Sequence, residues 1–217
     1  MPHCLNFPFT SQERRLIERL RTPADVQRYL NRLPYNTEPS PGRATLRSLR
    51  GVVRAGCAHC LEAALMAATV LEQHGYPPLV LSLESIDALD HVVFVYQRRG
   101  LWGSVARSRD PGLHGRAPVF RSARALALSY FDPYIDTSGC VKAYAVADLR
   151  ALGTYDWRLS TRHVWKVERY LLDFPHRPIR FSQRRVDRLR ARYFKYKREH
   201  RGHKPLYYDR RGWTEIP

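Results

Sequence analysis

The segment CLEAALMAATVLEQH, residues 60–74, constrains the fold more than any other stretch of this chain. It is filled with alanine, leucine and other strong helix formers, and Gly75 followed by two prolines supplies a stop. Apolar residues occur on nearly every side of the predicted helix, so we expect it to be buried on all sides rather than to cover a surface. The rest of the chain must therefore pack around one central helix.

Three short segments after this helix are rich in β-branched and aromatic residues, as strands are. They are LVLSL, VVFVY and WGSVAR, at residues 79–83, 92–96 and 102–107. The turn-like sequence QRRGL joins the last two, which predicts adjacent antiparallel strands. Together with the central helix, these strands predict an α+β fold in which the helix packs on a small antiparallel sheet.

Further helices are predicted on both sides of this region. Capping-box patterns that begin at Thr10 and Thr22 predict two short helices near the N-terminus. A segment dense in turn formers, residues 34–42, follows them and cannot continue a helix. After the strands, residues 119–170 are expected to form a helical scaffold, with helices in SARALALSYF, VADLRAL and RHVWKVERYLL.

Length and composition predict one globular domain. At 217 residues, of which 44% are hydrophobic, the chain is long enough for one sizeable core and too short for two. No apolar run approaches the ~20 residues of a membrane helix. The N-terminal residues MPHCLNFPFTSQERRL do not resemble a secretory signal, so a cytoplasmic location with reduced thiols is expected. We predict a domain over residues 1–176 and a tail over 177–217.

Cys60 and His91 are placed for nucleophilic chemistry. Cys60 begins the predicted central helix, where unpaired N–H groups and a partial positive charge favour the thiolate. His91 directly precedes the apolar strand VVFVY, from where its imidazole can reach the helix start and exchange a proton with the cysteine. An oxyanion hole would join the Cys60 backbone N–H with a donor from the upstream loop, where Tyr35 and Asn36 are candidates by position.

The spacing around this pair resembles the transglutaminase-like superfamily of papain-like cysteine hydrolases, and within it a bacterial branch. That superfamily has a Cys-x-Asp/Glu-x-Ala helix that ends in Gly-x-Pro, then a strand that begins with His. This sequence has Cys60-Leu61-Glu62-Ala63, Gly75-Tyr76-Pro77 and Asp90-His91, and the likeness covers residues 45–110. The resemblance implies a papain-like fold and acyl transfer through a thioester by a protease, amidase or transglutaminase-like enzyme. It implies a peptide or amide substrate and no cofactor or metal.

The resemblance leaves the third catalytic residue open. In the superfamily, an aspartate that orients the histidine follows the aromatic residue of the next strand by four positions, and here that position is Ala106. Asp110 is the predicted substitute, and Ser108 or a backbone carbonyl are the alternatives. Three other histidines have weaker claims to a role: His59, His74 and His114.

Other interpretations of the same residues stay open. Unpaired cysteine is often buried, so Cys60 can be a core thiol, and His91 can be a satisfied polar residue at a strand end. Cys57 and Cys60 also form a C-x-x-C motif, as in thiol–disulfide oxidoreductases. The basic stretch before it does not resemble the strand that such a fold requires. A zinc site would need a second cysteine pair, which Cys4 and Cys140 do not provide.

The C-terminal tail carries much of the positive charge. The chain has 37 Lys and Arg against 20 Asp and Glu, a formal net charge of +17, and residues 177–217 hold 14 of the former and 4 of the latter. Aromatic residues are interleaved with these cations: Tyr193, Phe194, Tyr196, Tyr207, Tyr208 and Trp213. Such a tail can bind nucleic acid or another polyanion, anionic lipid or a partner protein, or it can be a solvated helix. A non-catalytic module that binds through this tail is the alternative to the enzyme.

Overall fold

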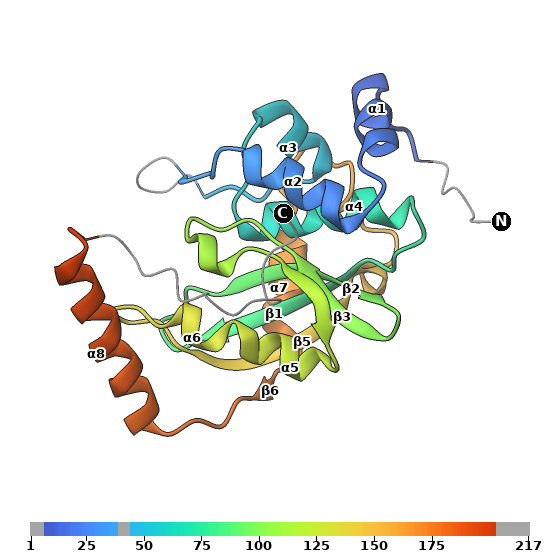
Figure 1. Cartoon of the computed structure of the whole chain (residues 1–217). Coiled ribbons are helices and arrows are strands. Elements are labelled where there is room, and N and C mark those ends of the chain that lie inside the picture. The colour runs from blue at the N-terminus through green and yellow to red at the C-terminus, as the bar shows by residue number, and fades with distance from the viewer. Residues whose placement is uncertain (1–6, 39–43, 203–217) are drawn as a thin grey trace.

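One antiparallel sheet of six strands forms the centre of the molecule, with helices on both faces (Figure 1). The computed structural model describes residues 7–38 and 44–202. The strand order is β4-β3-β2-β1-β5-β6, and neighbouring strands are antiparallel. The strand bounds are Leu79–Ser85 for β1, His91–Arg98 for β2, Leu101–Val105 for β3, Arg116–Phe120 for β4, Val141–Asp148 for β5 and Arg177–Pro178 for β6. The predicted α+β class and the three predicted strands are confirmed.

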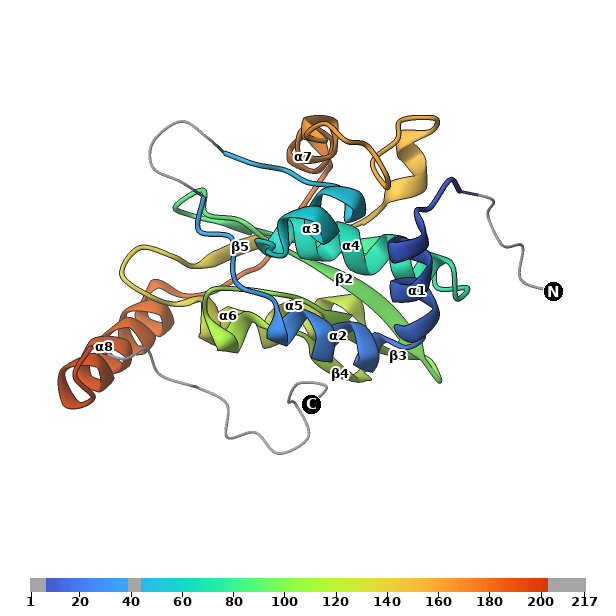
Figure 2. The same cartoon turned by 90° about the horizontal axis from the view of Figure 1, so that it is seen from above.

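The predicted central helix is α4, Cys60–Glu72, which lies along one face of the sheet (Figure 2). All residues from Leu61 to Leu71 are buried, because the helix has the sheet on one side and the N-terminal helices on the other. Gly75 takes a left-handed conformation with a φ of +84°, which ends the helical turn and leads the chain into β1. This helix therefore presents its first turn at a fixed point above the sheet.

Both predicted capping boxes are present at the N-terminal helices. Helix α1 spans Ser11–Arg19 and helix α2 spans Pro23–Arg32, and each is capped by the threonine before it. The helical stretch that precedes α4 is α3, Leu49–Ala55. Apolar residues of the three helices join the core around α4, among them Ile17 and Leu30. They therefore hold α4 against the sheet from outside.

Both faces of the central strands are buried, which explains why their sequences are almost continuously apolar. Along β2, Val92 and Phe94 belong to the core around α4. Val93 and Val95 belong to a second core on the opposite face, under helices α5 and α6. The sheet thus separates two apolar layers, and β2 carries its side chains into each of them.

The predicted helical scaffold over residues 119–170 is correct for two segments and wrong for a third. SARALALSYF contains α5, Ala123–Ser129, and leads into α6, Phe131–Tyr134, and RHVWKVERYLL contains most of α7, Trp165–Asp173. VADLRAL is not an α-helix, because its first three residues end strand β5 and the rest form a short 3-10 turn. Strand β5 pairs with the outer edge of β1, so sheet pairing outweighs the local helix preference of alanine and leucine.

The C-terminal region adds one strand and one helix. Strand β6 pairs with β5, and α8, Gln183–Glu199, lies at the margin of the molecule (Figure 1). Its buried residues are Val186 and Tyr193. Cys4, Tyr207, Tyr208 and Trp213 lie outside the described residues. Within residues 7–38 and 44–202, no helix combines the length and the apolar character that spanning a membrane requires.

Candidate active site

Cys60 and His91 meet at the point where α4 and β2 both begin. Cys60 is the first residue of α4 and His91 is the first residue of β2. The imidazole of His91 lies close enough to the Cys60 thiol to lower its pKa. His91 is buried, whereas Cys60 is partly exposed. The structure therefore brings the two predicted residues together.

The pKa of the Cys60 thiol lies far below its ordinary value. Burial by itself would raise this pKa, because the thiolate loses hydration. Hydrogen bonds from His59 and His91, together with the positive charge on each imidazole, outweigh burial and lower the pKa of Cys60 to about 5. The helix N-terminus favours the thiolate as well. At neutral pH Cys60 is therefore a thiolate, which is the nucleophilic form of cysteine.

His59 is a second imidazole at the sulfur, although its predicted claim to a role was weaker than that of His91. Burial would lower the pKa of His59, but its hydrogen bond to Cys60 and the negative charges of Cys60 and Glu62 raise that pKa to about 9. Its Nε2 atom donates to the Thr45 carbonyl across 2.8 Å, which leaves Nδ1 for the sulfur. His59 is therefore a fixed imidazolium beside Cys60. Its position directly before the cysteine was the available signal.

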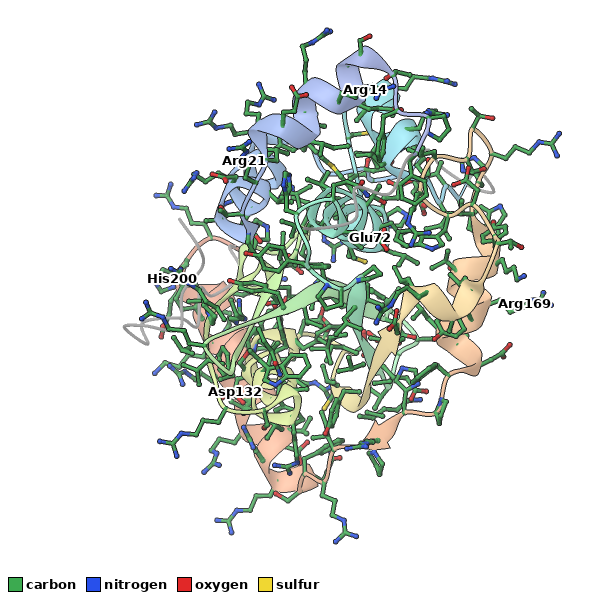
Figure 3. The ribbon with its side chains drawn as sticks, turned by 90° about the vertical axis from the view of Figure 1, so that its right-hand side faces the viewer. Arg14, Arg21, Glu72, Asp132, Arg169 and His200 are labelled. Carbon is green, nitrogen blue, oxygen red and sulfur yellow. The ribbon has the colours of Figure 1, made fainter. Side chains whose placement is uncertain are left out.

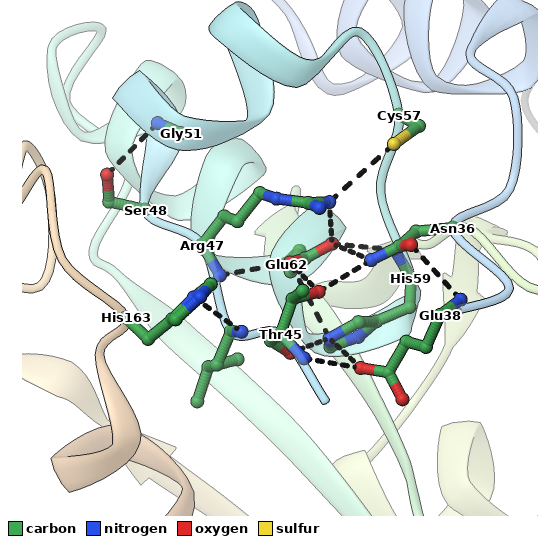
Figure 4. A network of polar contacts seen from close by, with 11 residues as sticks. Asn36, Glu38, Thr45, Arg47, Ser48, Gly51, Cys57, His59, Glu62 and His163 are labelled. Carbon is green, nitrogen blue, oxygen red and sulfur yellow. Dashed lines mark hydrogen bonds and ion pairs between the residues drawn. The ribbon is translucent and has the colours of Figure 1, made fainter. Parts of the chain in front are cut away.

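The buried carboxylate of Glu62 organises the first turn of α4 (Figure 4). Its oxygens accept hydrogen bonds from Asn36 Nδ2 at 3.1 Å, Thr45 Oγ1 at 2.9 Å, Arg47 N at 3.0 Å and His59 N at 3.1 Å. The Arg47 guanidinium lies 3.5 Å from the same carboxylate. Glu62 therefore joins two upstream segments to the helix turn that holds the nucleophile, which is a physical reason for an acidic residue two positions after Cys60.

Tyr35 and Asn36 lie beside the segment that leads into α4, as a parallel bridge joins Tyr35 to Ala58. Asn36 does not suit the predicted oxyanion hole, because its backbone N–H donates to the Ala58 carbonyl and its side-chain amide donates to Thr45 and Glu62. Burial and the negative charge of Cys60 raise the pKa of Tyr35 to about 12. Its hydroxyl therefore stays protonated near the sulfur, and Tyr35 is the better candidate for the second donor.

The backbone between the two cysteines of the C-x-x-C motif is extended. Ala58 is in the parallel bridge, and His59 has φ −89° and ψ −177°. An extended chain advances about 3.3 Å per residue, so the Cα atoms of Cys57 and Cys60 are about 10 Å apart, beyond the limit of about 7 Å for a disulfide. Cys57 Sγ instead lies 3.6 Å from Arg47 Nη1. This geometry argues against a thiol–disulfide centre.

A backbone carbonyl, one of the alternatives to Asp110, orients His91. The Nε2 atom of His91 donates to the carbonyl of Leu113 across 2.8 Å, which leaves Nδ1 to face Cys60. Asp110 lies at the start of the same turn, where its carbonyl accepts from the Leu113 N–H at 2.9 Å and its N–H donates to Ser108 Oγ at 3.2 Å. Asp110 and Ser108 therefore shape the turn that presents the Leu113 carbonyl.

Ala106, the position where the resemblance predicts an aspartate, is held by the side chain of Gln27 from α2. Gln27 Nε2 donates to the Ala106 carbonyl at 2.8 Å, and the Ala106 N–H donates to Gln27 Oε1 at 2.9 Å. Gln27 and Ala106 are both buried. The amide of Gln27 thus pairs with the end of β3 as a neighbouring strand would, and this fixes the chain just before the turn that reaches His91.

The guanidinium of Arg116 braces the loop that orients His91. Its Nη2 donates to the Gly112 carbonyl at 2.7 Å, and its Nη1 donates to the carbonyls of His114 at 2.9 Å and Gly115 at 3.2 Å. The hydroxyl of Tyr130 also donates to the His114 carbonyl at 3.0 Å. The neighbours of Leu113 are therefore fixed on both sides. Sequence analysis did not single out Arg116, because nothing in RAPVF signals that the side chain folds inward.

Of the other two histidines that the sequence placed lower, His74 lies just past the far end of α4 and His114 follows Leu113 in the loop that orients His91. His74 contacts the Ile17 carbonyl at 2.9 Å. His114 is buried next to Arg107, and burial lowers its pKa. Among residues 7–38 and 44–202, histidine, cysteine, aspartate and glutamate side chains form no group of three or more that could bind a metal ion. The sequence matches no family model and no curated protein.

Proposed function

We propose that the protein is a cysteine acyl-transfer enzyme that cleaves an amide bond through a thioester on Cys60. The observation that carries this proposal is the contact between Cys60, whose thiol has a pKa of about 5, and His91. His91 has its other nitrogen fixed on the Leu113 carbonyl. A thiolate beside a positioned imidazole is the arrangement that nucleophilic catalysis requires. A buried structural cysteine has no need of either imidazole.

The reaction would proceed in two halves. The Cys60 thiolate attacks the amide carbonyl carbon and forms a C–S bond, while the carbonyl oxygen becomes an oxyanion. The Nδ1–H of His91 then donates its proton to the leaving amine as the C–N bond breaks, which leaves a thioester. In the second half, water loses a proton to His91 and attacks the thioester, and the carboxylic acid leaves as Cys60 is released. An amine in place of water would give transfer instead of hydrolysis.

The oxyanion would be stabilised by the backbone N–H of Cys60 and the hydroxyl of Tyr35. Backbone donors at a helix N-terminus are aligned before the reaction starts, so they cost little reorganisation when charge develops. His59 supplies a positive charge beside the same atoms. This charge does not depend on whether His91 is protonated. With a pKa of about 9, His59 stays charged at neutral pH, and its charge favours each anionic state of the cycle.

The arrangement of α4 and β2 also supports a transglutaminase-like, papain-like fold. In that superfamily the nucleophile begins a central helix and the histidine begins a strand of an antiparallel sheet, as Cys60 and His91 do here. The carbonyl of Leu113 would take the place of the missing aspartate. The main reason for the non-catalytic alternative was that Ala106 replaces the aspartate that orients the histidine. The hydrogen bond from His91 to the Leu113 carbonyl weakens that reason, since it gives His91 an orienting partner.

Trapping of the acyl-enzyme tests this proposal. The full chain is mixed with a set of peptide nitroanilides, quenched in acid and analysed by intact mass, with Cys60→Ser and Cys57→Ser as the paired variants. We expect an adduct with the mass of the acyl group on Cys60, released by hydroxylamine, retained in Cys57→Ser and lost in Cys60→Ser. An adduct on Cys57, or no adduct with any amide in the set, would leave the non-catalytic module as the better description.

A further inference from the structure

Helix α8 presents a row of cations to solvent. Its inner side is anchored on the domain by the buried residues Val186 and Tyr193. The exposed cations recur every three or four positions, which places them on one face of the helix, roughly opposite these anchors. This cation row consists of Arg184, Arg188, Arg192, Lys195 and Arg198. Successive members are about 4.5–6 Å apart along the helix axis.

Nearby acceptors hold the flanking cations of α8 against the domain. Arg185 Nη2 lies 2.7 Å from Asp132 Oδ1, and Arg190 Nε donates to the Asp136 carbonyl at 3.1 Å. Within the cation row, Lys195 lies 3.9 Å from Glu199. The row therefore keeps more positive than negative charge on the side that faces away from the domain.

The cation row is held on a firmly anchored helix. Ser182 caps the first turn, and the rings of Phe131 and Phe181 pack at a centroid distance of 5.3 Å just before α8. Like charges four residues apart, such as Arg184 and Arg188, repel each other and oppose helix formation. Packing against the domain keeps these cations together in spite of that repulsion, and a bound polyanion would relieve it.

An exposed aromatic side chain accompanies the cations. Phe194 is 39% exposed at the margin of the row, and beyond it the rings of Tyr196 and His200 stack at 3.7 Å. Unpaired bases stack on such rings, whereas the bases of a duplex are already stacked on each other. A helix that lies in a membrane surface needs a free apolar side, and the apolar side of α8 is used against the domain.

We propose that α8 binds single-stranded nucleic acid, with the backbone phosphates along the cation row and a base on Phe194. The row matches a repeating anion better than a single charged group, because its cations recur at nearly even spacing along about 21 Å of helix. Electrostatic contact with the phosphates makes the binding tolerant of sequence and sensitive to salt. This proposal is independent of the chemistry at Cys60.

Salt-dependent binding of a fluorescent 16-nucleotide oligothymidylate to the full chain tests the proposal. The α8 variant is Arg184→Gln, Arg188→Gln and Lys195→Gln. The matched control removes the same charge from exposed residues near α1, through Arg14→Gln, Arg15→Gln and Arg21→Gln. Helices α1 and α8 lie at opposite margins of the molecule (Figure 1), and in the side view of Figure 3 Arg14 and Arg21 lie above His200, which follows α8. Circular dichroism and melting temperature verify that both variants are folded.

We expect the α8 variant to bind about tenfold more weakly, and the slope of log K against log salt to become shallower by about 2, since each lost phosphate contact removes about 0.7 for a single strand. The control should bind within about threefold of the wild type, because salt screens the effect of charges near α1 on a strand bound at α8. Phe194→Ala should weaken binding about fivefold without changing the slope. Equal weakening by both triple variants, an unaffected Phe194→Ala, equal affinity for a duplex, or preferential binding to phosphatidylserine vesicles would each overturn the proposal.

Discussion

The Nε2 atom of His91 donates to the backbone carbonyl of Leu113 across 2.8 Å. A carbonyl fixes the imidazole as a carboxylate would, but it does not add a negative charge. The charge at this site comes from the other side, where His59 is an imidazolium in hydrogen-bond contact with Cys60. Orientation and electrostatic support are thus supplied to the cysteine–histidine pair by two different neighbours.

Replacing His59 with glutamine should raise the pKa of the Cys60 thiol. The substitution removes a hydrogen bond and a positive charge from the thiolate, while burial continues to disfavour it. We expect the pKa of Cys60 to rise from about 5 by about one to three pH units. Ultraviolet absorbance of the thiolate, followed against pH in a Cys57→Ser background, measures this change. His74→Gln is the matched control, and an equal effect of both substitutions would show that His59 has no special role.

The starts of strand β2 and helix α4 could be predicted because the helix and strand propensities of the neighbouring residues determine both. Alanine and leucine from position 61 onward form a helix in almost any context, and the apolar run after His91 is a strand whichever layer covers it. The cysteine and the histidine could therefore be paired from their order and spacing. The end of β3 was less predictable, since Gln27 reaches Ala106 from 79 positions away in the sequence.

Residues that act through tertiary contacts could not be found in the same way. Arg116 binds carbonyl groups of the turn before it, and a sequence does not show whether an arginine turns inward or outward. The last three residues of strand β5 were predicted as helix because VADLRAL favours helix locally, and only the edge of β1 makes them part of a strand. Leu113 orients His91 with a backbone atom, so its side chain carries no signal of that contact.

Arg116→Met should slow acyl transfer by about tenfold or more while leaving substrate binding almost unchanged. Without the guanidinium, the Gly112 carbonyl loses its donor and the turn around Leu113 loosens, so His91 loses the fixed partner that aligns it with Cys60. The measurement is kcat and KM for the amide found by acyl-enzyme trapping, together with the melting temperature. Arg116→Lys should recover part of kcat. A rise in KM at unchanged kcat would contradict the positioning role.

Glu62→Ala should destabilise the fold by about 3 kcal/mol or more, since it leaves several buried donors without an acceptor. Glu62→Gln keeps the shape and one acceptor oxygen, so it should cost less. Urea unfolding measures both. The control is Glu84→Ala, which breaks an exposed ion pair with Lys142 at 3.0 Å and should change the free energy of unfolding by less than about 1 kcal/mol. Similar losses at Glu62 and Glu84 would contradict the role of Glu62.

The Cys60–His59 pair should make stability depend on pH below about 6.5 and not above it. The pKa of Cys60 is lowered from 9.0 to about 5, so its contribution is complete above pH 9 and is lost as the pH falls through 5. The pKa of His59 is raised from 6.5 to about 9, so its contribution is complete below pH 6.5 and is lost as the pH rises through 9. Between pH 6.5 and pH 9 stability rises with pH through Cys60 and falls with pH through His59, so the two slopes cancel.

The free energy of unfolding should therefore fall between pH 6.5 and pH 5 in the wild type, and it should fall less in Cys60→Ser. Other groups titrate in this range, but they are common to both proteins, so the difference isolates the pair. Urea unfolding at four or more pH values in reducing buffer supplies the comparison. Parallel curves for the two proteins would mean that Cys60 is not a thiolate in the folded state.

The most direct test of the proposed site is the rate at which iodoacetamide alkylates Cys60 between pH 4 and pH 9, with the modified cysteine identified by peptide mapping. Cys60 should react rapidly at pH 6, with a rate that follows a pKa of about 5, and His91→Ala should shift that profile toward higher pH. Cys57, which has no imidazole partner in this account, should be labelled much more slowly than Cys60 at pH 6. Fast labelling of Cys57 instead, or labelling of Cys60 only after the protein unfolds, would contradict a catalytic thiolate at this position.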